Sequence, residues 1–183
     1  MDRRTIIGID PGTNLLGFGV IDVVDGKPAY VDMGVLDLRK EKDAYSKLRQ
    51  IFDTVSEVIR TYHGTEMALE SPFYGKNAQV ILKLGRAQGA AMIAAMEQGL
   101  SVTEYAPREA KQAITGNGAA SKEQVSIMLE KTLGTRLEAE HLDATDALAI
   151  AMCHFYTTSN PLSAQKSSSS WEKFILAHPD RVK

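Results

Sequence analysis

The segment TIIGIDPGTN, residues 5–14, is a short apolar run that ends at an acidic residue followed by a proline-glycine turn. Apolar runs of this length between turn residues are typical of buried strands, so we expect residues 5–10 to form one. Two more strand-like runs follow at residues 17–24 and 28–36, separated by the turn residues Asp25-Gly26-Lys27. The first third of the chain is therefore predicted to be an antiparallel meander of three strands.

Helices and strands alternate through the rest of the chain. Apolar residues recur at helical spacing, and turn or capping residues such as Ser121 separate the segments. The predicted helices span residues 44–62, 77–98, 107–115, about 121–131 and about 143–155, and the predicted strands span residues 66–70 and 101–105. Strands that alternate with helices after a meander cannot all be antiparallel neighbours. We therefore expect an α/β fold in three layers, a mixed five-stranded sheet with helices on both faces.

The predicted helix at residues 77–98 is rich in alanine and glycine in its second half. Such small side chains permit another element to approach closely. The small side chains are compatible with two packing partners for this helix, the sheet and a second subunit.

Length and composition indicate one folded domain. The 183 residues are 44% hydrophobic and 24% charged, as is usual for a globular protein with its own core. We expect this domain to span residues 1–158, and the Ser-rich residues 159–183 to form a linker and a flexible tail. The one cysteine, Cys153, excludes an intrachain disulfide and is expected to be a small buried apolar side chain. With no signal peptide or apolar run of membrane-spanning length, a cytoplasmic protein with no membrane contact is predicted.

The net charge of −2 gives no general attraction to polyanions, so any nucleic-acid surface must be local. A local excess of positive charge does occur between residues 71 and 122. That segment holds three acidic residues against six basic ones, which are Lys76, Lys83, Arg86, Arg108, Lys111 and Lys122.

Two acidic residues end two apolar strands. Asp10 follows residues 6–9 and precedes Pro11, and Glu70 follows residues 67–69 in the same way. In open α/β sheets, ligands bind at the carboxyl edge of the strands, so both carboxylates are expected there. Asp143 and Asp146 lie three residues apart at the start of a helix and therefore share a face.

Taken one at a time, these acids have ordinary explanations. Asp10 suits a turn, Glu70 a surface position at a strand end, and Asp143 a helix N-cap. Together, crowded carboxylates repel one another unless a cation neutralises them, and ligands that are all oxygen favour Mg²⁺ or Mn²⁺. Two such ions about 4 Å apart can activate water and stabilise the leaving oxygen of a phosphodiester. The four acids thus predict a site with two divalent ions and hydrolytic chemistry.

Five sequence blocks resemble the bacterial RuvC family of Holliday junction resolvases, over about residues 5–156. The blocks are residues 8–13 (GIDPGT), 69–73 (LESPF), 76–78 (KNA), 82–89 (LKLGRAQG) and 143–149 (DATDALA). The resemblance implies a ribonuclease H-like fold and a homodimer that makes paired nicks across a four-way DNA junction during recombination and repair. It also implies a branch-migration motor complex as a partner.

The resemblance assigns roles to individual residues. Asp10, Glu70, Asp143 and Asp146 match the metal ligands, and Phe73 matches an aromatic that stacks on a base at the junction. Lys111 and Lys122 match basic residues near the scissile phosphate, and we add the basic residues of the same segment, Lys76, Lys83 and Arg86, to the expected DNA surface. His141 is an auxiliary candidate, because some relatives use a histidine near this point as a ligand or base.

Two other functions compete with the nuclease. Residues 8–13 are also similar to a phosphate loop of actin-like and sugar kinases, although this chain lacks a second such loop and has room for one domain. ATP hydrolysis without DNA would favour that class. A catalytically inactive junction-binding protein is the other alternative, and the four retained acids argue against it.

Overall fold

A computed structural model of the chain describes residues 4–71, 77–137 and 142–159. Its elements, in chain order, are β1 (Arg4–Pro11), β2 (Leu15–Val24), β3 (Lys27–Asp37), α1 (Ala44–Tyr62), β4 (Glu66–Glu70), α2 (Ala78–Glu97), β5 (Ser101–Tyr105), α3 (Pro107–Thr115), α4 (Lys122–Leu133) and α5 (Leu142–Ser159). The strand order is β3-β2-β1-β4-β5. β1, β2 and β3 pair antiparallel, whereas β4 and β5 run parallel to β1. The predicted mixed five-stranded sheet is confirmed.

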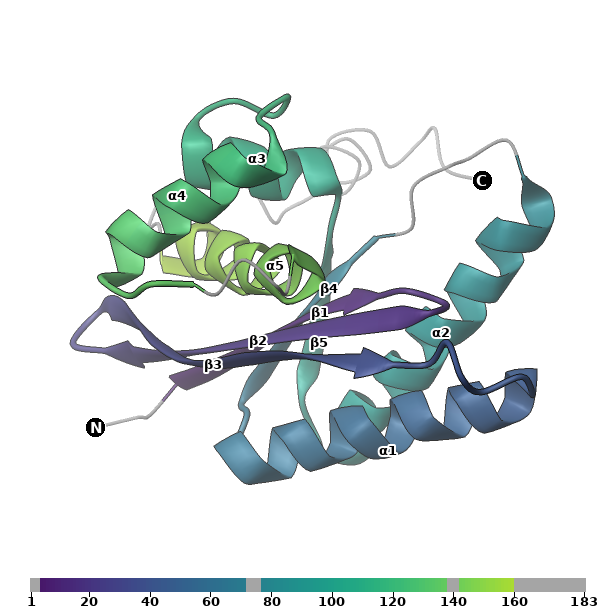
Figure 1. The fold of residues 1–183 in the computed structure, drawn as a ribbon. Coiled ribbons are helices and arrows are strands. Elements are labelled where there is room, and N and C mark those ends of the chain that lie inside the picture. Colours follow the sequence, from purple (N-terminus) through teal and green to yellow (C-terminus); the bar gives the residue numbers. More distant parts are fainter. Residues whose placement is uncertain (1–3, 72–76, 138–141, 160–183) are drawn as a thin grey trace, which may run out of the picture.

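Helices cover both faces of the sheet, as predicted (Figure 1). α3, α4 and α5 lie on one face and α1 and α2 on the other. Alternate residues of β1 point to opposite faces, so Ile6 packs into the α5 side, while Ile7 and Ile9 pack against α1 and α2. Both cores are built largely from aliphatic side chains and alanine.

Glycines in β1 and β2 set how closely α5 lies on the sheet. A Cβ atom at Gly17 would lie 2.1 Å from the carbonyl oxygen of Asp143, and one at Gly8 would lie 2.0 Å from that of Ala147. No side chain fits in these gaps, so the helix backbone rests directly on the strands. This contact places the first turn of α5 over the end of β1 and the start of β2.

A buried polar chain ties α5 to the strands beneath it. His154 is 3% exposed and lies 2.8 Å from the Tyr105 hydroxyl through Nδ1 and 2.7 Å from Glu66 Oε2 through Nε2. Because a carboxylate can only accept, Nε2 donates to Glu66, and Nδ1 accepts from Tyr105. Arg4 also bonds to Glu66 and holds the pKa of that carboxyl below its usual range, while burial lowers the pKa of His154.

The end of the last helix differs from the prediction. α5 continues to Ser159 rather than stopping near residue 155. The hydroxyls of Thr157 and Thr158 donate to carbonyl oxygens four residues earlier, at 2.8 and 2.7 Å, which lets these β-branched residues remain helical. Arg4 also contacts Thr158 and Ser159. Ser159, the first residue of the predicted linker and tail, thus belongs to α5, and residues 160–183 lie outside the described residues.

The predicted environment of Cys153 is confirmed. The residue is free and 2% exposed, and burial raises the pKa of its thiol to about 11. None of the helices in the described ranges combines the length and hydrophobicity that a bilayer span requires.

Candidate active site

Three of the predicted acids form one cluster at the carboxyl edge of the sheet. Asp10 lies near the end of β1, and Asp143 and Asp146 lie in the first turns of α5. Each offers a carboxylate oxygen, and these oxygens lie within 4.8 Å of one another. All three side chains are half-buried, so the cluster faces the surface without being fully hydrated.

Glu70 stands beside this cluster at the end of β4, which runs parallel to β1. Its carboxyl bonds to that of Asp10, and both residues line a pocket of about 190 Å³. Burial, followed by the bond to Asp10 and the nearby negative charges, raises the pKa of Glu70 to about 9. Burial likewise raises the pKa of Asp10. Without a cation, these two carboxyls hold a proton between them at neutral pH.

Lys122 reaches into the cluster from the first residue of α4 and forms an ion pair with Asp146. Burial lowers the pKa of Lys122, but the contact with Asp146 and the other carboxylates nearby outweigh it and raise the pKa overall. The resemblance placed Lys122 near the scissile phosphate, but it did not give this ion pair with the half-buried Asp146. The two residues are 24 positions apart and meet only because α4 packs beside α5.

The pocket contains further residues that were not predicted. Leu84, Gln88 and Pro107 line it together with Asp10 and Glu70. Gln88 is 6% exposed, and its side-chain amide donates to Glu104 on β5. The sequence did offer one signal for Gln88, a polar side chain within the Ala-rich part of a helix. If such an amide is buried, it needs a hydrogen-bond partner.

The donor set fits a hard divalent cation. The cluster offers only carboxylate oxygens, and no histidine or cysteine belongs to it among the described residues. Burial and mutual repulsion already disfavour the charged state of Asp10 and Glu70, and a cation would relieve both effects.

The predicted DNA-contacting residues do not all gather here. Lys111 lies on α3, one turn beyond Pro107 of the acidic pocket. Lys83 and Arg86 are exposed on α2 and line a different cleft, between α1 and α2. Phe73, Lys76 and His141 lie outside the described residues.

Comparisons with known proteins agree on one family. A sequence profile described as crossover junction endodeoxyribonuclease RuvC matches residues 6–154. The crossover junction endodeoxyribonuclease RuvC of Bacteroides fragilis is 49% identical over 183 residues, which cover 99% of this chain and 97% of the relative. The enzyme of the same name from Christiangramia forsetii is 48% identical over 181 residues, covering 99% and 94%. Among solved structures, T. thermophilus RuvC in complex with Holliday junction substrate has a TM-score of 0.79 and 32% identity, over 85% of this chain and 95% of that chain.

Proposed function

The chain belongs to the RuvC family of crossover junction endodeoxyribonucleases, and on that premise we propose that it resolves four-way DNA junctions by hydrolysing phosphodiester bonds at the acidic cluster. The observation that carries this assignment is the convergence of Asp10, Asp143 and Asp146, with Glu70 beside them, in a chain that matches the family over residues 6–154. The same match disfavours the kinase-like alternative.

We infer that the four carboxylates hold two divalent cations, Mg²⁺ or Mn²⁺. Asp10, Asp143 and Asp146 are close enough to share an ion, and Glu70 extends the donor set on the Asp10 side. When bound, the ions would supply an activated water and stabilise the charge on the leaving oxygen.

Residues around the carboxylates have separate tasks. Lys122 brings an ammonium group to the edge of the cluster, where it can neutralise charge on a phosphodiester. Gln88, held by Glu104, and the apolar Leu84 shape the pocket wall next to Glu70. Lys111, one turn along α3 from the pocket residue Pro107, adds positive charge for the DNA backbone.

We propose a homodimer, because two symmetric nicks need two active sites. One exposed face of α2 supports this assembly. Leu82, Gly85, Gly89, Ile93 and Met96 lie three or four residues apart and form what we call the α2 stripe. Its three large side chains are 56%, 55% and 63% exposed, and a Cβ atom at either glycine would meet nothing within 4 Å. A second helix could therefore pack closely against it.

The substrate suggests the remaining partners. An enzyme that cuts junctions in chromosomal DNA would work in the cytoplasm. It would also meet the motor complex that moves the branch point. Both statements rest on the proposed function.

Replacing Asp146 by asparagine tests the catalytic assignment. The variant Asp146→Asn keeps the shape of the side chain but removes a charge from the cation site. We expect cleavage of a synthetic four-way junction in Mg²⁺ to fall by at least about 100-fold, or about 2.7 kcal/mol in transition-state stabilisation. Calorimetric titration should show weaker Mn²⁺ binding, while binding of the junction itself is retained.

Asp53→Asn is the matched control, because Asp53 also pairs with a basic residue, Arg49, but on the exposed surface of α1. It should cut the junction at the wild-type rate. Near-normal cleavage by Asp146→Asn would show that the acidic cluster is not the active site.

A further inference from the structure

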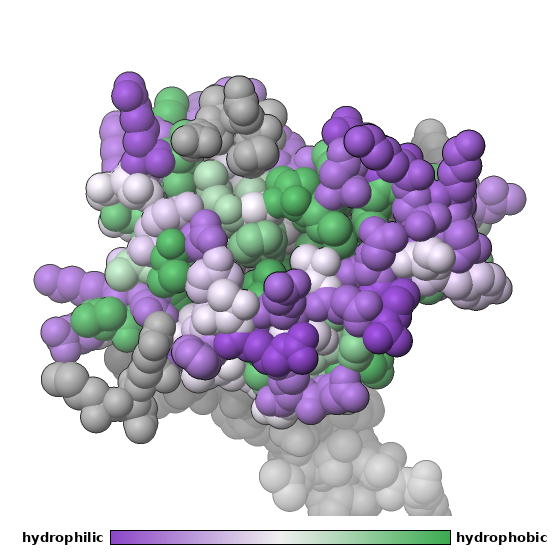
Figure 2. Space-filling view, turned by 60° about the horizontal axis from the view of Figure 1, so that its bottom comes forward, coloured by the Kyte–Doolittle hydropathy of each residue, from purple (hydrophilic) through white to green (hydrophobic). Residues whose placement is uncertain are grey.

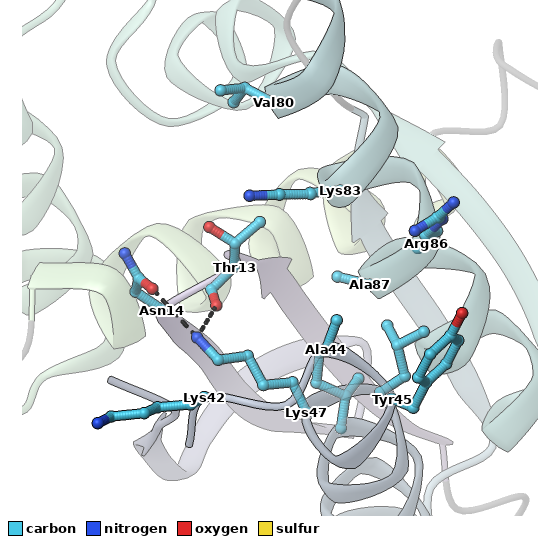
Figure 3. Close-up of a pocket in the computed structure, with 12 residues that line it drawn as sticks. Thr13, Asn14, Lys42, Ala44, Tyr45, Lys47, Val80, Lys83, Arg86 and Ala87 are labelled. Carbon is cyan, nitrogen blue, oxygen red and sulfur yellow. Dashed lines mark hydrogen bonds between the residues drawn. The ribbon is translucent and has the colours of Figure 1, made fainter. Parts of the chain in front are cut away.

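A cleft of about 320 Å³ lies between α1 and α2, outside the acidic pocket (Figure 3). Lys83 and Lys47 reach into it from opposite walls, Lys42 lies at one end, and Arg86 and Tyr45 lie at the other. Val80, Lys83 and Ala87 contribute from one face of α2, at helical spacing. These three residues face away from the α2 stripe, whereas Arg86, four residues from Leu82, lies between the cleft and the stripe.

The charged side chains that line the cleft are all positive. Among the described residues that line it, four are basic and none is acidic, although the whole chain carries a net charge of −2. The acids next to Lys42 in the sequence have partners of their own. Glu41 accepts from the Asp43 amide and from Gln50, and Asp43 accepts from the Ser46 amide as the N-cap of α1. The cleft therefore presents concentrated positive charge to an anionic ligand.

The cleft is joined to the active site by one turn of the chain. Thr13 and Asn14 line it, and they follow Asp10 directly after Pro11 and Gly12. Lys47 donates to the Thr13 carbonyl at 3.2 Å and to Asn14 Oδ1 at 3.3 Å, which fixes this turn against α1. A polyanion that enters at the acidic pocket can thus continue along the turn into the cleft.

The cleft suits a nucleic-acid backbone better than other occupants. Its floor includes the apolar side chains of Leu48, Ile51 and Ala87, against which deoxyribose can pack, and Tyr45 at the rim is 79% exposed. Figure 2 shows the α1 side of the molecule, where hydrophilic side chains are interspersed with hydrophobic ones. A second copy placed face to face would bring like charges together, which disfavours self-association here.

We propose that the cleft between α1 and α2 binds the phosphate backbone of a duplex arm of the junction, beyond the phosphodiester that is cut. The inference rests on the proposed function and extends it, because it assigns a second DNA contact to Lys42, Lys83 and Arg86. Each phosphate that a basic side chain neutralises releases counterions, so it contributes to the salt dependence of binding. Base sequence should matter little at this site.

The test compares salt dependence in a variant that carries Lys42→Gln, Lys83→Gln and Arg86→Gln. All three side chains are at least partly exposed, so the fold should be kept, and Lys47 is left intact because it holds the turn. Binding of long-armed and short-armed four-way junctions is measured in EDTA across a range of salt concentrations. On long arms, the slope of log K against log salt should become shallower by about 0.9 for each phosphate that the variant no longer neutralises. On short arms, the change should be smaller.

A second triple variant, Lys27→Gln, Arg60→Gln and Lys131→Gln, removes the same charge from exposed positions outside the cleft. Equal slopes for the two triple variants would overturn the proposal. So would a cleft variant that binds DNA normally but loses binding to poly-glutamate, since an acidic protein would then be the occupant. Failure of the wild type to cut any four-way junction would refute the proposed function instead, because binding in EDTA is measured without cleavage.

Discussion

The carboxyls of Glu70 and Asp10 meet because β4 and β1 are parallel neighbours that end at the same edge. Without a cation, the charged state of both carboxyls is disfavoured, and the pKa of each group is therefore raised. A cation that binds here replaces a proton, so metal binding and pH must be coupled.

The pH dependence of stability follows from the raised pKa. With a pKa of about 9 in the folded state against 4.5 unfolded, Glu70 keeps its proton on folding between these values. The folded state then binds more protons than the unfolded state, so stability falls as pH rises through this window. The slope for one proton is about 1.4 kcal/mol per pH unit. Thermal unfolding in EDTA should show a lower Tm at about pH 9 than at about pH 7, and saturating Mg²⁺ should make this difference smaller.

Two variants identify the group responsible. Glu70→Gln cannot titrate, so its Tm in EDTA should depend less on pH over the same range. Glu123→Gln changes an exposed acid whose pKa is lowered, chiefly by Ser121, and which is therefore ionised throughout. It should behave like the wild type. If Glu70→Gln shows the full wild-type pH dependence, Glu70 does not hold the proton.

Single residues were predictable where the signal was local. Asp10 and Glu70 each follow an apolar strand and precede a turn, so the sheet edge could be read from adjacent residues. The partners Lys122 and Asp146, or Gln88 and Glu104, lie far apart in the sequence and meet only through helix packing. No spacing rule predicts such pairs.

At the scale of elements, α4 depends on its first turn to present Lys122. Ser121, predicted as a capping residue, forms a capping box with Gln124. The Ser121 amide donates to Gln124 Oε1 at 2.9 Å, and the Gln124 amide donates to the Ser121 hydroxyl at 3.3 Å. These two bonds satisfy backbone groups that would otherwise lack partners at the helix start.

Removing the cap should therefore affect both stability and catalysis. We expect Ser121→Ala to lower the free energy of unfolding by about 1 kcal/mol and to slow junction cleavage, because a frayed first turn holds Lys122 less firmly. Ser126→Ala makes the same chemical change within α4 and should be neutral or slightly stabilising, since alanine is the better helix former. Urea unfolding and cleavage rates measure both effects. Equal losses in the two variants would contradict a role for the cap.

Most elements could be predicted because their signals are periodic or local. The bounds of α1, β4, β5 and α3 agree with the predicted ranges, since turn or capping residues mark their ends. The predicted end of α5 was too early. Threonine is a poor helix former, but here the hydroxyls of Thr157 and Thr158 bond to carbonyl oxygens within the helix. The close packing of the α5 backbone on Gly8 and Gly17 was not predicted either, because it depends on which strands are neighbours in the sheet.

The whole molecule separates opposite charges that the net charge of −2 hides. Carboxylates gather at the edge of the sheet, while a basic cleft opens between α1 and α2. For a polyanionic substrate the two regions have different tasks: the cleft attracts the backbone, and the acidic pocket must first take up cations. Two copies joined through the α2 stripe would present two such pairs of regions to one junction.

The α2 stripe makes the dimer testable. Leu82→Asp with Ile93→Asp places two charges on an exposed apolar face, where they would be buried and unpaired in a dimer but hydrated in a monomer. Sedimentation should show a dimer for the wild type and a monomer for this variant, with an unchanged Tm in dilute solution. Single nicks should then replace paired cuts on a mobile junction. Ile127→Asp, at a side chain 50% exposed on α4, is the control and should leave the dimer intact. A double variant that still sediments as a dimer would place the interface elsewhere.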